Sequence, residues 1–417
     1  MTVGDASLFV MMKYRAVSST LVVCLFSVTP LGCDHEVDRA DFQGMQLSEA
    51  ALTESVTNSV ADDPAAAALG RKLFFDPGLS SDGKIACVNC HDPEHGFSDP
   101  KPRSVGVRKQ TGARHSMPIT AAALQPFLFW DGRVDSAWSQ PLKALENPKE
   151  MDFTRVEIAR YVSVTYGQEY DTIFEALPDL SQAPARALPG DAAWDAMSKP
   201  LQDEVNRVFS NVGKALEAYE RKLLCNDTRF DSWQRGEIEL NDAELAGAGT
   251  FDREHCARCH SGPAFSDGEF HDIGIPSSDK GRLLGAEQLL DDPFNGEGDY
   301  SDDVKAGAAK LLSVGEESGQ EGAFRTASLR GVAQRTYFGH AAHKKSLRDF
   351  ILDIYRGRGR RDRDRDRGAT VGQLDEKLDG VDVDDDQVDD LIAFLHTLDC
   401  PTPSADLLAP AATSDSP

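Results

Sequence analysis

The sequence has no apolar run long enough to cross a bilayer and no excess of positive charge. The stretch Leu21–Phe26 near its start is far shorter than the roughly 20 residues that a membrane-spanning helix needs. Lysine and arginine number 44 against 69 aspartates and glutamates, which gives a formal net charge of −25. This charge disfavours nucleic acid and anionic membrane surfaces as partners. It would attract a basic redox protein, and it also suits plain solubility or a salty habitat.

Strand-forming segments are sparse, and methionine is absent after Met197. Apolar residues recur mainly at helical spacing, so we predict a mostly α protein, and 417 residues are enough for two ordinary domains. The missing methionine removes one common metal ligand from the second half of the chain.

The N-terminus has the pattern of an export signal. Lys13 and Arg15 precede the short apolar stretch, which ends at Leu31-Gly32-Cys33. Leu-Gly-Cys is typical of the end of a lipoprotein signal, although Pro30 departs from that pattern. The signal of residues 1–33 is therefore either cleaved in the ordinary way or lipidated at Cys33, and both outcomes predict a periplasmic protein.

Two copies of Cys-x-x-Cys-His stand out among the eight cysteines: Cys87-Val88-Asn89-Cys90-His91 and Cys256-Ala257-Arg258-Cys259-His260. In this pentapeptide the two thiols add to the vinyl groups of a c-type haem, and the histidine ligates the iron. A zinc ribbon would need its two Cys-x-x-Cys pairs about 15 to 20 residues apart, and a redox dithiol would explain neither histidine. The sequence predicts two covalently bound haem c groups, with His91 and His260 as axial ligands.

An internal repeat surrounds the two motifs. A helical pattern precedes each motif and places a glycine four residues before a phenylalanine, Gly70 before Phe74 and Gly247 before Phe251. Further along, residues 216–225 align without a gap with residues 391–400. This layout resembles cytochrome c domains, in which an N-terminal helix crosses a C-terminal helix.

The repeat sets the expected domain boundaries. We predict one haem domain over residues 61–225 and a second over residues 226–400, after a polar leader of residues 34–60 and before a disordered tail of residues 401–417. Residues 277–321 are acidic and glycine-rich, which indicates a long surface insertion, and the run of Arg, Gly and Asp over residues 356–367 indicates a solvated loop.

Two cysteines remain beside the haem motifs and the signal. Cys225 and Cys400 end the two aligned segments, and an oxidising compartment would allow them to pair. The alternative is two separate buried thiols.

Several longer motifs resemble the bacterial di-haem cytochrome c peroxidase family, and in particular its MauG-like branch. The resemblance extends over about residues 65–400. It rests on these segments taken together: Leu73–Ser80, His91–Asp99, Phe129–Arg133, Glu146–Met151, Arg229–Asp231 and Phe324–Arg330.

The resemblance implies unequal roles for the two haems. The first would bind peroxide, the second would transfer electrons, and Trp130 matches the tryptophan that carries charge between them. Gln140 and Glu150 stand where the family places the polar residues of its peroxide pocket. Glu150 would act as general acid and base toward H₂O₂, and Gln140 would hold peroxide or water by hydrogen bonds. Without that context, a single glutamate is most often a solvated surface carboxylate.

Two positions depart from the family's pattern. Members that need reductive activation carry a histidine that blocks the first haem, and Val107 occupies that position here, with His95 and His115 nearby but off register. We therefore expect an open first haem. His115 also replaces an asparagine that helps to bind calcium between the haems, so a Ca²⁺ site would have to rest on other donors such as Thr326.

The second haem lacks the methionine ligand that ordinary members use. The MauG-like branch uses a tyrosine, and Tyr355 matches it within residues 346–357. The spacing from Leu347 is one residue longer than the family's, which turns a helix by about 100°, so His340 and His343 are alternatives. Ligation by tyrosine and histidine would lower the iron potential relative to methionine and histidine.

The sequence thus predicts a periplasmic di-haem c-type oxidoreductase that reduces hydrogen peroxide. Its electrons would come from a small redox protein, a cytochrome or a cupredoxin, or from residues of a protein substrate. The alternative is a non-catalytic electron-transfer cytochrome in which both irons are six-coordinate.

Overall fold

The computed structural model describes residues 37–48, 52, 54–312, 314, 320–356 and 371–410. The predicted export signal with Cys33, most of the Arg-, Gly- and Asp-rich run, and residues 411–417 lie outside these residues. Among the helices that can be described, none is both long and apolar enough to cross a membrane.

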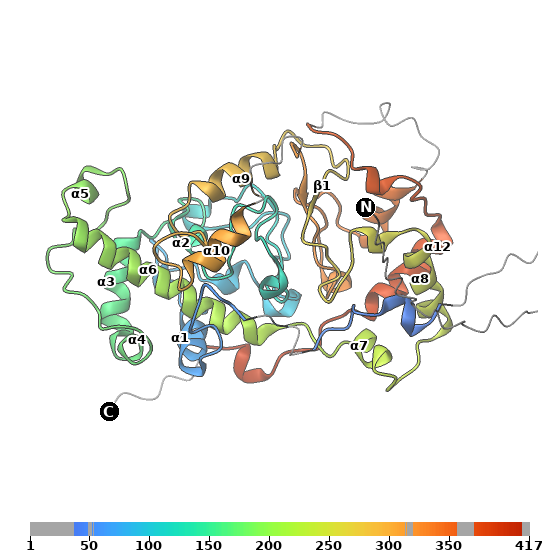
Figure 1. Cartoon of the computed structure of the whole chain (residues 1–417), viewed down its shortest axis with the longest axis horizontal. Helices are drawn as coiled ribbons and strands as arrows, with labels where there is room; N and C mark the ends of the chain where they lie inside the picture. Colours follow the sequence, from blue (N-terminus) through green and yellow to red (C-terminus); the bar gives the residue numbers. More distant parts are fainter. Residues whose placement is uncertain are drawn as a thin grey trace, which may run out of the picture. The chain divides into compact units, whose positions relative to one another are not determined.

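The described chain is mostly helical, as predicted (Figure 1). The α-helices before Cys225 are α1 (Pro64–Phe74), α2 (Gln140–Glu146), α3 (Arg155–Thr165), α4 (Gly167–Ile173), α5 (Ala192–Asp195) and α6 (Lys199–Glu220). Those that follow are α7 (Arg229–Gln234), α8 (Asp242–Arg253), α9 (Arg282–Leu290), α10 (Val304–Leu311), α11 (Leu347–Tyr355) and α12 (Asp385–His396). Two short strands, β1 (Phe270–His271) and β2 (Phe324–Arg325), pair antiparallel.

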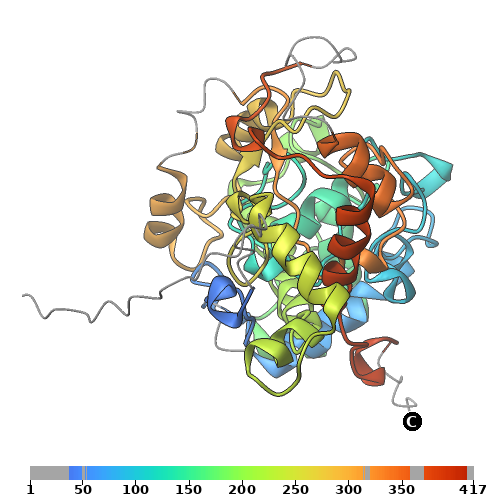
Figure 2. The ribbon, with the colours of Figure 1, turned by 90° about the vertical axis from the view of Figure 1, so that its right-hand side faces the viewer.

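Two pairs of crossing helices organise the structure: α1 packs on α6, and α8 packs on α12, the latter pair side by side in Figure 2. Both crossings depend on glycine. A Cβ atom added to Gly70 would lie 1.8 Å from the carbonyl oxygen of Ala215, and one added to Gly247 would lie 1.9 Å from that of Asp390. Only a residue without a side chain lets the backbones approach so closely.

Aromatic rings pack across each crossing one helical turn further on. The ring centroids of Phe74 and Tyr219 are 5.2 Å apart, and those of Phe251 and Phe394 are 5.3 Å apart. The glycine and the phenylalanine singled out in each half of the sequence therefore have the same structural role in both halves.

Two hydrophobic cores surround these helix pairs. One is built mainly from residues 69–223 and the other mainly from residues 230–398. We call residues 54–225 the first lobe and residues 226–400 the second lobe; the exact domain boundaries stay a prediction.

The sequence predicts a polar leader, but part of the leader packs into an apolar core. Phe42 is 2% exposed and belongs to the second core, where its ring centroid lies 5.4 Å from that of Phe394. Met45 is buried in the same core. The leader thus covers the second lobe.

The tail and the insertion also differ from expectation. Residues Ala405–Leu407 form a 3₁₀ helix, and the Tyr219 hydroxyl donates to the Leu407 carbonyl at 2.6 Å, so this part of the tail packs on the first lobe. The insertion contains α9 and α10, and the side chain of Arg282 at the start of α9 is fully buried. Its Nη1 donates to the Gly132 carbonyl at 2.8 Å.

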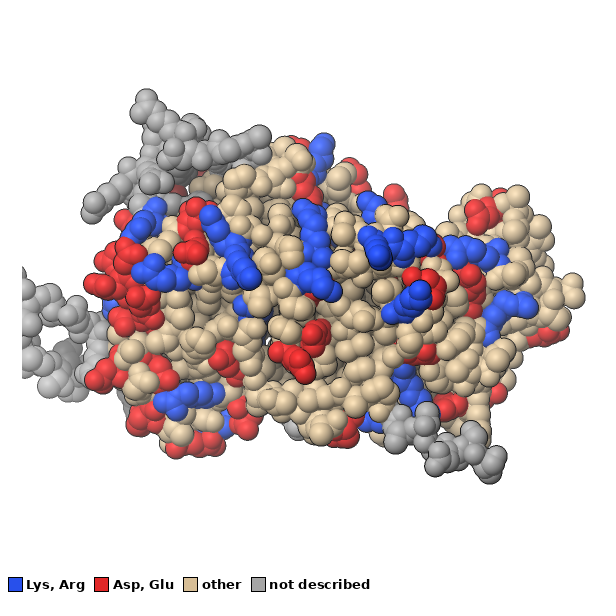
Figure 3. Space-filling view, turned by 180° about the vertical axis from the view of Figure 1, so that it is seen from behind, with Lys and Arg blue, Asp and Glu red and all other residues tan. Residues whose placement is uncertain are grey.

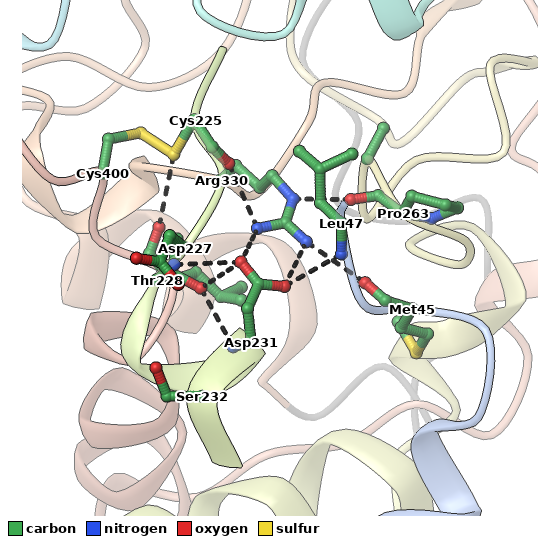
Figure 4. Close-up of polar contacts among 12 residues, drawn as sticks. Met45, Leu47, Cys225, Asp227, Thr228, Asp231, Ser232, Pro263, Arg330 and Cys400 are labelled. Carbon is green, nitrogen blue, oxygen red and sulfur yellow. Dashed lines mark hydrogen bonds and ion pairs between the residues drawn. A yellow bond between two sulfur atoms is a disulfide. The ribbon is translucent and has the colours of Figure 1, made fainter. Parts of the chain in front are cut away.

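Cys225 and Cys400 form a disulfide, which decides between the two alternatives left open by the sequence. Beside it, Arg330 and Asp231 form an ion pair in which both side chains are fully buried (Figure 4). Nη1 and Nη2 of Arg330 lie 2.9 and 3.0 Å from the two carboxylate oxygens. Arg330 also donates to the main-chain oxygens of Met45, Cys225 and Pro263.

Replacing Gly70 by alanine should destabilise the protein, because the new Cβ would overlap the Ala215 carbonyl. We expect a loss of about 1–3 kcal/mol in the free energy of unfolding, measured by urea denaturation. Gly167→Ala is the matched control, since its Cβ would meet Leu177 Cδ1 at an ordinary 3.5 Å. Equal stability of the two variants would contradict the close crossing of α1 and α6.

Asp231→Asn should cost about 3–5 kcal/mol, because it leaves the guanidinium of Arg330 buried without a counter-charge. Asp227→Asn breaks the exposed pair with Arg235 and should cost about 0–1 kcal/mol. Although burial opposes it, Arg330 lowers the pKa of Asp231. The stability from this pair is therefore present above the ordinary aspartate pKa and is lost as the pH falls through the lower folded value, a loss that acid unfolding of the Asn variant should lack.

Candidate functional site

The first Cys-x-x-Cys-His motif folds into one tight turn, which follows α1 and the short 3₁₀ helix Pro77–Leu79. The amides of Cys90 and His91 donate to the Cys87 carbonyl at 3.1 and 2.9 Å, and all three side chains line one cavity, the first cavity. His91 Nδ1 lies 3.2 Å from the Phe97 carbonyl oxygen, which leaves Nε2 for a metal. Burial lowers the pKa of His91, so the ring is neutral, as ligation requires.

The second motif repeats this geometry in a second cavity. The His260 amide donates to the Cys256 carbonyl at 2.9 Å, and His260 Nδ1 lies 3.0 Å from the Phe265 carbonyl oxygen. Cys256, Cys259 and His260 all line the second cavity.

None of the four motif cysteines is in a disulfide. Burial raises the pKa of Cys87 and of Cys256 to about 12. A redox dithiol works through a lowered thiol pKa, so these values count against that alternative.

Gln140 and Glu150 lie in the first cavity with His91. Gln140 is the first residue of α2, and Glu150 follows that helix after a short turn, in which Asn147 Nδ2 donates to Glu150 Oε1 at 2.7 Å. Burial raises the pKa of Glu150, while Arg133 and Asn147 act in the opposite direction. Glu150 is thus a cavity carboxyl and not a solvated surface group.

A valine stands at the position where members that need reductive activation carry the blocking histidine. Val107 is fully buried and its amide donates to the Glu150 carbonyl at 2.8 Å, so its side chain offers no ligand atom. His95 Nδ1 is held 2.9 Å from Asp92 Oδ2. His115 borders both cavities, with Nε2 3.3 Å from Ser98 Oγ.

Trp130 lines both cavities and so stands in the wall between them. Its indole N–H donates to the His115 carbonyl at 2.9 Å. The preceding Phe129 has a positive φ of 62°, and the Arg133 guanidinium lies over its ring, 3.6 Å from the centroid. The turn that carries Trp130 is therefore fixed at several points.

Two buried arginines in the same wall fit a cofactor that carries carboxylates. Arg325 and Arg335 line both cavities, and burial lowers the pKa of each to about 10. Their partners within the described residues are carbonyl and amide oxygens and the Met117 sulfur, and Arg335 Nε has none. Buried cations need counter-charges, and the propionates of haem would supply them.

Sequence reasoning missed both arginines as site residues. Arg325 lies within a segment that carries the family resemblance, so a signal for it was present. Arg335 has no motif to mark it.

The second cavity holds two of the three candidate ligands of the second haem. Tyr355, the last residue of α11, and His340 both line it. His340 is buried flat against Phe324, with ring centroids 3.6 Å apart, and burial lowers its pKa to about 4. His343 Nε2 instead lies 2.6 Å from Asp353 Oδ2.

Three further side chains near the wall carry atoms that could ligate a metal ion. Met117 borders both cavities, and its sulfur accepts from Arg325 Nη2 at 3.4 Å. Thr326 Oγ1 and His115 Nδ1 are buried without a hydrogen-bond partner among the described residues. The calcium site stays a prediction.

The site thus consists of two cavities, each with a Cys-x-x-Cys-His turn, and of a shared wall that carries a tryptophan. The family model described as di-haem cytochrome c peroxidase matches residues 64–239. The methylamine utilization protein MauG of Paracoccus denitrificans is 29% identical over 377 residues, which cover 81% of this chain and 89% of that protein. Cytochrome c551 peroxidase of Pseudomonas aeruginosa is 27% identical over 360 residues, 84% of this chain and 83% of that protein.

Solved structures agree with this fold. A MauG-like protein associated with microbial copper homeostasis has a TM-score of 0.61 at 22% identity and covers 86% of this chain and 97% of its own. The diheme peroxidase BthA of Burkholderia thailandensis has a TM-score of 0.57 at 23% identity, covering 85% and 89%. The chain therefore matches the di-haem cytochrome c peroxidase family model over residues 64–239, and over most of its length it is similar to MauG and to cytochrome c551 peroxidase.

Proposed function

We propose that this protein is a periplasmic oxidoreductase that reduces hydrogen peroxide at the first of two covalently bound haem c groups. Cys87 and Cys90 would hold the first haem, and Cys256 and Cys259 the second. The observation that carries the proposal is the half-buried carboxyl of Glu150, which shares the first cavity with His91. The similarity to cytochrome c551 peroxidase and to MauG supports it.

When bound, the first haem supplies the iron at which peroxide gains two electrons. His91 Nε2 is free to ligate that iron because Nδ1 is held by the Phe97 carbonyl. The Glu150 carboxylate takes a proton from one peroxide oxygen and returns it to the other, which leaves as water. Gln140 orients peroxide by hydrogen bonding, and Trp130, fixed by the His115 carbonyl, gives the electrons a path through the wall.

The source of the electrons follows from the charge of the surface. On the face shown in Figure 3, acidic side chains gather at the end that carries α8 and α12. Asp384 caps α12, and Asp385 and Asp386 lie in its first turn. We infer a basic partner at the second lobe, either a small cytochrome or cupredoxin or a protein substrate oxidised in the manner of MauG chemistry.

Tyr355 is the ligand we propose for the second haem. It lies at the end of α11 in the second cavity, and the phenolate oxygen is a hard donor that lowers iron potentials. His340 shares the cavity and is the alternative that experiment has to separate from it.

The haem-loaded protein should show a high-spin ferric signal that disappears when peroxide is added. Two low-spin haems without a response to peroxide would contradict the proposal and indicate an electron-transfer cytochrome. Glu150→Gln should leave the resting spectrum unchanged and slow peroxide reduction by about 10²–10⁴-fold. Glu175→Gln, at an exposed site, is the control and should keep the wild-type rate.

The pH profile adds a check on Glu150. Because burial raises its pKa, the basic carboxylate is lost at a higher pH than for an ordinary glutamate. The wild-type rate should fall as the pH decreases through this raised pKa, and the Gln variant should lack that limb.

Tyr355→Phe should change the absorption and paramagnetic resonance spectra of the second haem and leave those of the first unchanged. Tyr337→Phe is the matched control, since Tyr337 lines the same cavity. If Tyr355→Phe leaves the spectra unchanged and His340→Ala alters them, the ligand is His340 and the tyrosine assignment is wrong.

A further inference from the structure

The first cavity contains a carboxyl group that none of the steps above uses. Glu220, the last residue of α6, lines this cavity with Cys87 and is only 6% exposed. Its Oε2 atom is buried and has no hydrogen-bond partner within the described residues. A buried carboxyl oxygen without a partner costs stability, so its presence in this cavity calls for a function.

The internal repeat shows that the fold itself does not require an acid at this position. Residues 216–225 align with 391–400, which pairs Glu220 with Leu395 and Glu217 with Ile392. Leu395 lines the second cavity just as Glu220 lines the first. The same position on the same kind of helix therefore presents a carboxyl group to one cavity and an apolar side chain to the other.

The charged group that faces Glu220 favours a bound proton: it is Glu217 on the same helix. The Cys87 sulfur, from the loop after α1, and the Tyr219 hydroxyl lie close enough to feel the charge of Glu220. Burial raises the pKa of Glu220 to about 8, and Glu217 adds to the rise. No cation among the described residues opposes this shift.

The charges further out act on Glu217. It accepts from Asn58 Nδ2 at 2.8 Å and is buried, which raises its pKa. Arg221 acts on it to lower the pKa and Asp62 to raise it, while Lys310 of α10 also feels its charge. These groups tune Glu220 only through Glu217.

We propose that Glu220 binds a proton when the haem at the first motif is reduced and releases it when that haem is oxidised. One electron, passed on from the second haem, stays on the iron. One proton, taken up from the bulk solvent, forms the O–H bond at Oε2 and returns to the solvent on oxidation. Removal of one positive charge from the iron makes the nearby carboxylate more basic, and oxidation reverses both changes. This inference rests on the proposed function, because it requires haem at Cys87 and Cys90.

The coupling gives the two haems different responses to pH. The midpoint potential of the first haem should fall as the pH rises through the pKa of Glu220. At its steepest, the reduction equilibrium should change tenfold per pH unit, which is about 59 mV for one electron. The second haem faces Leu395, and its potential should not share this dependence.

The test is a spectroscopic redox titration of the haem-loaded full chain over a range of pH. Glu220→Gln, which keeps the shape of the side chain and cannot ionise, should remove the fall in the first potential and leave the second potential unchanged. Infrared difference spectra should show a protonated carboxyl band appear on reduction of the wild type and not of the variant. An unchanged pH slope in Glu220→Gln would overturn the proposal.

Glu217→Gln provides a second, graded variant. It removes the charge that raises the pKa of Glu220, so the fall in potential should persist and move to lower pH. An unmoved pH range would place the proton on another group.

Failure of this inference can be told apart from failure of the proposed function. Absence of covalent haem from the first motif would contradict the function. Two bound haems with an unaltered pH slope in Glu220→Gln would contradict only the coupling.

Discussion

The buried ion pair between Arg330 and Asp231 fixes the segment on which both cavities depend. Residues 324–330 run from strand β2 to Arg330, and Arg325, Ala327 and Ser328 from this segment line both cavities. Arg330 pins the end of the segment to α7, to the leader and to the backbone beside the disulfide. Because neither charge reaches solvent, the pair has to stay complete, and the wall between the cavities is held in place with it.

The two lobes share a crossed helix pair and a Cys-x-x-Cys-His turn, and their cavities differ in a few polar side chains. The glycine crossings, the aromatic pairs and the Cys-x-x-Cys-His turns are equivalent in both. The first cavity adds Gln140, Glu150 and Glu220, whereas the second adds Tyr355 and His340. In the proposed function the motif would determine where each haem is attached, and these other lining side chains would determine what each haem can do.

The sequence predicted what local spacing controls. The pair Gly70 and Phe74 has a counterpart at the same spacing in the second half of the chain, so the two helix crossings could be predicted. The cysteine motifs indicate their own chemistry. The sequence could not predict which polar residues, or which isolated apolar residues, would be buried. Phe42 stands in a polar segment and finds its partner Phe394 only in the folded chain, and Glu220 looks like one more polar residue on an amphipathic helix. Periodicity shows which face is covered; it does not show that a cofactor covers it.

The charges in the wall between the two cavities differ in sign from most of the surface charges. The surface is strongly acidic, yet the wall between the cavities carries Arg325 and Arg335, which favour an added electron on either side of it. A carboxylate at Glu220 would oppose them at the first cavity alone, and a protonated Glu220 would not. With Glu220 protonated at low pH, the two cations would favour reduction of the first haem, and at high pH the carboxylate would make that haem harder to reduce than it is at low pH. In the proposed coupling, the protonation of one side chain would set how electrons are shared across the wall that holds Trp130.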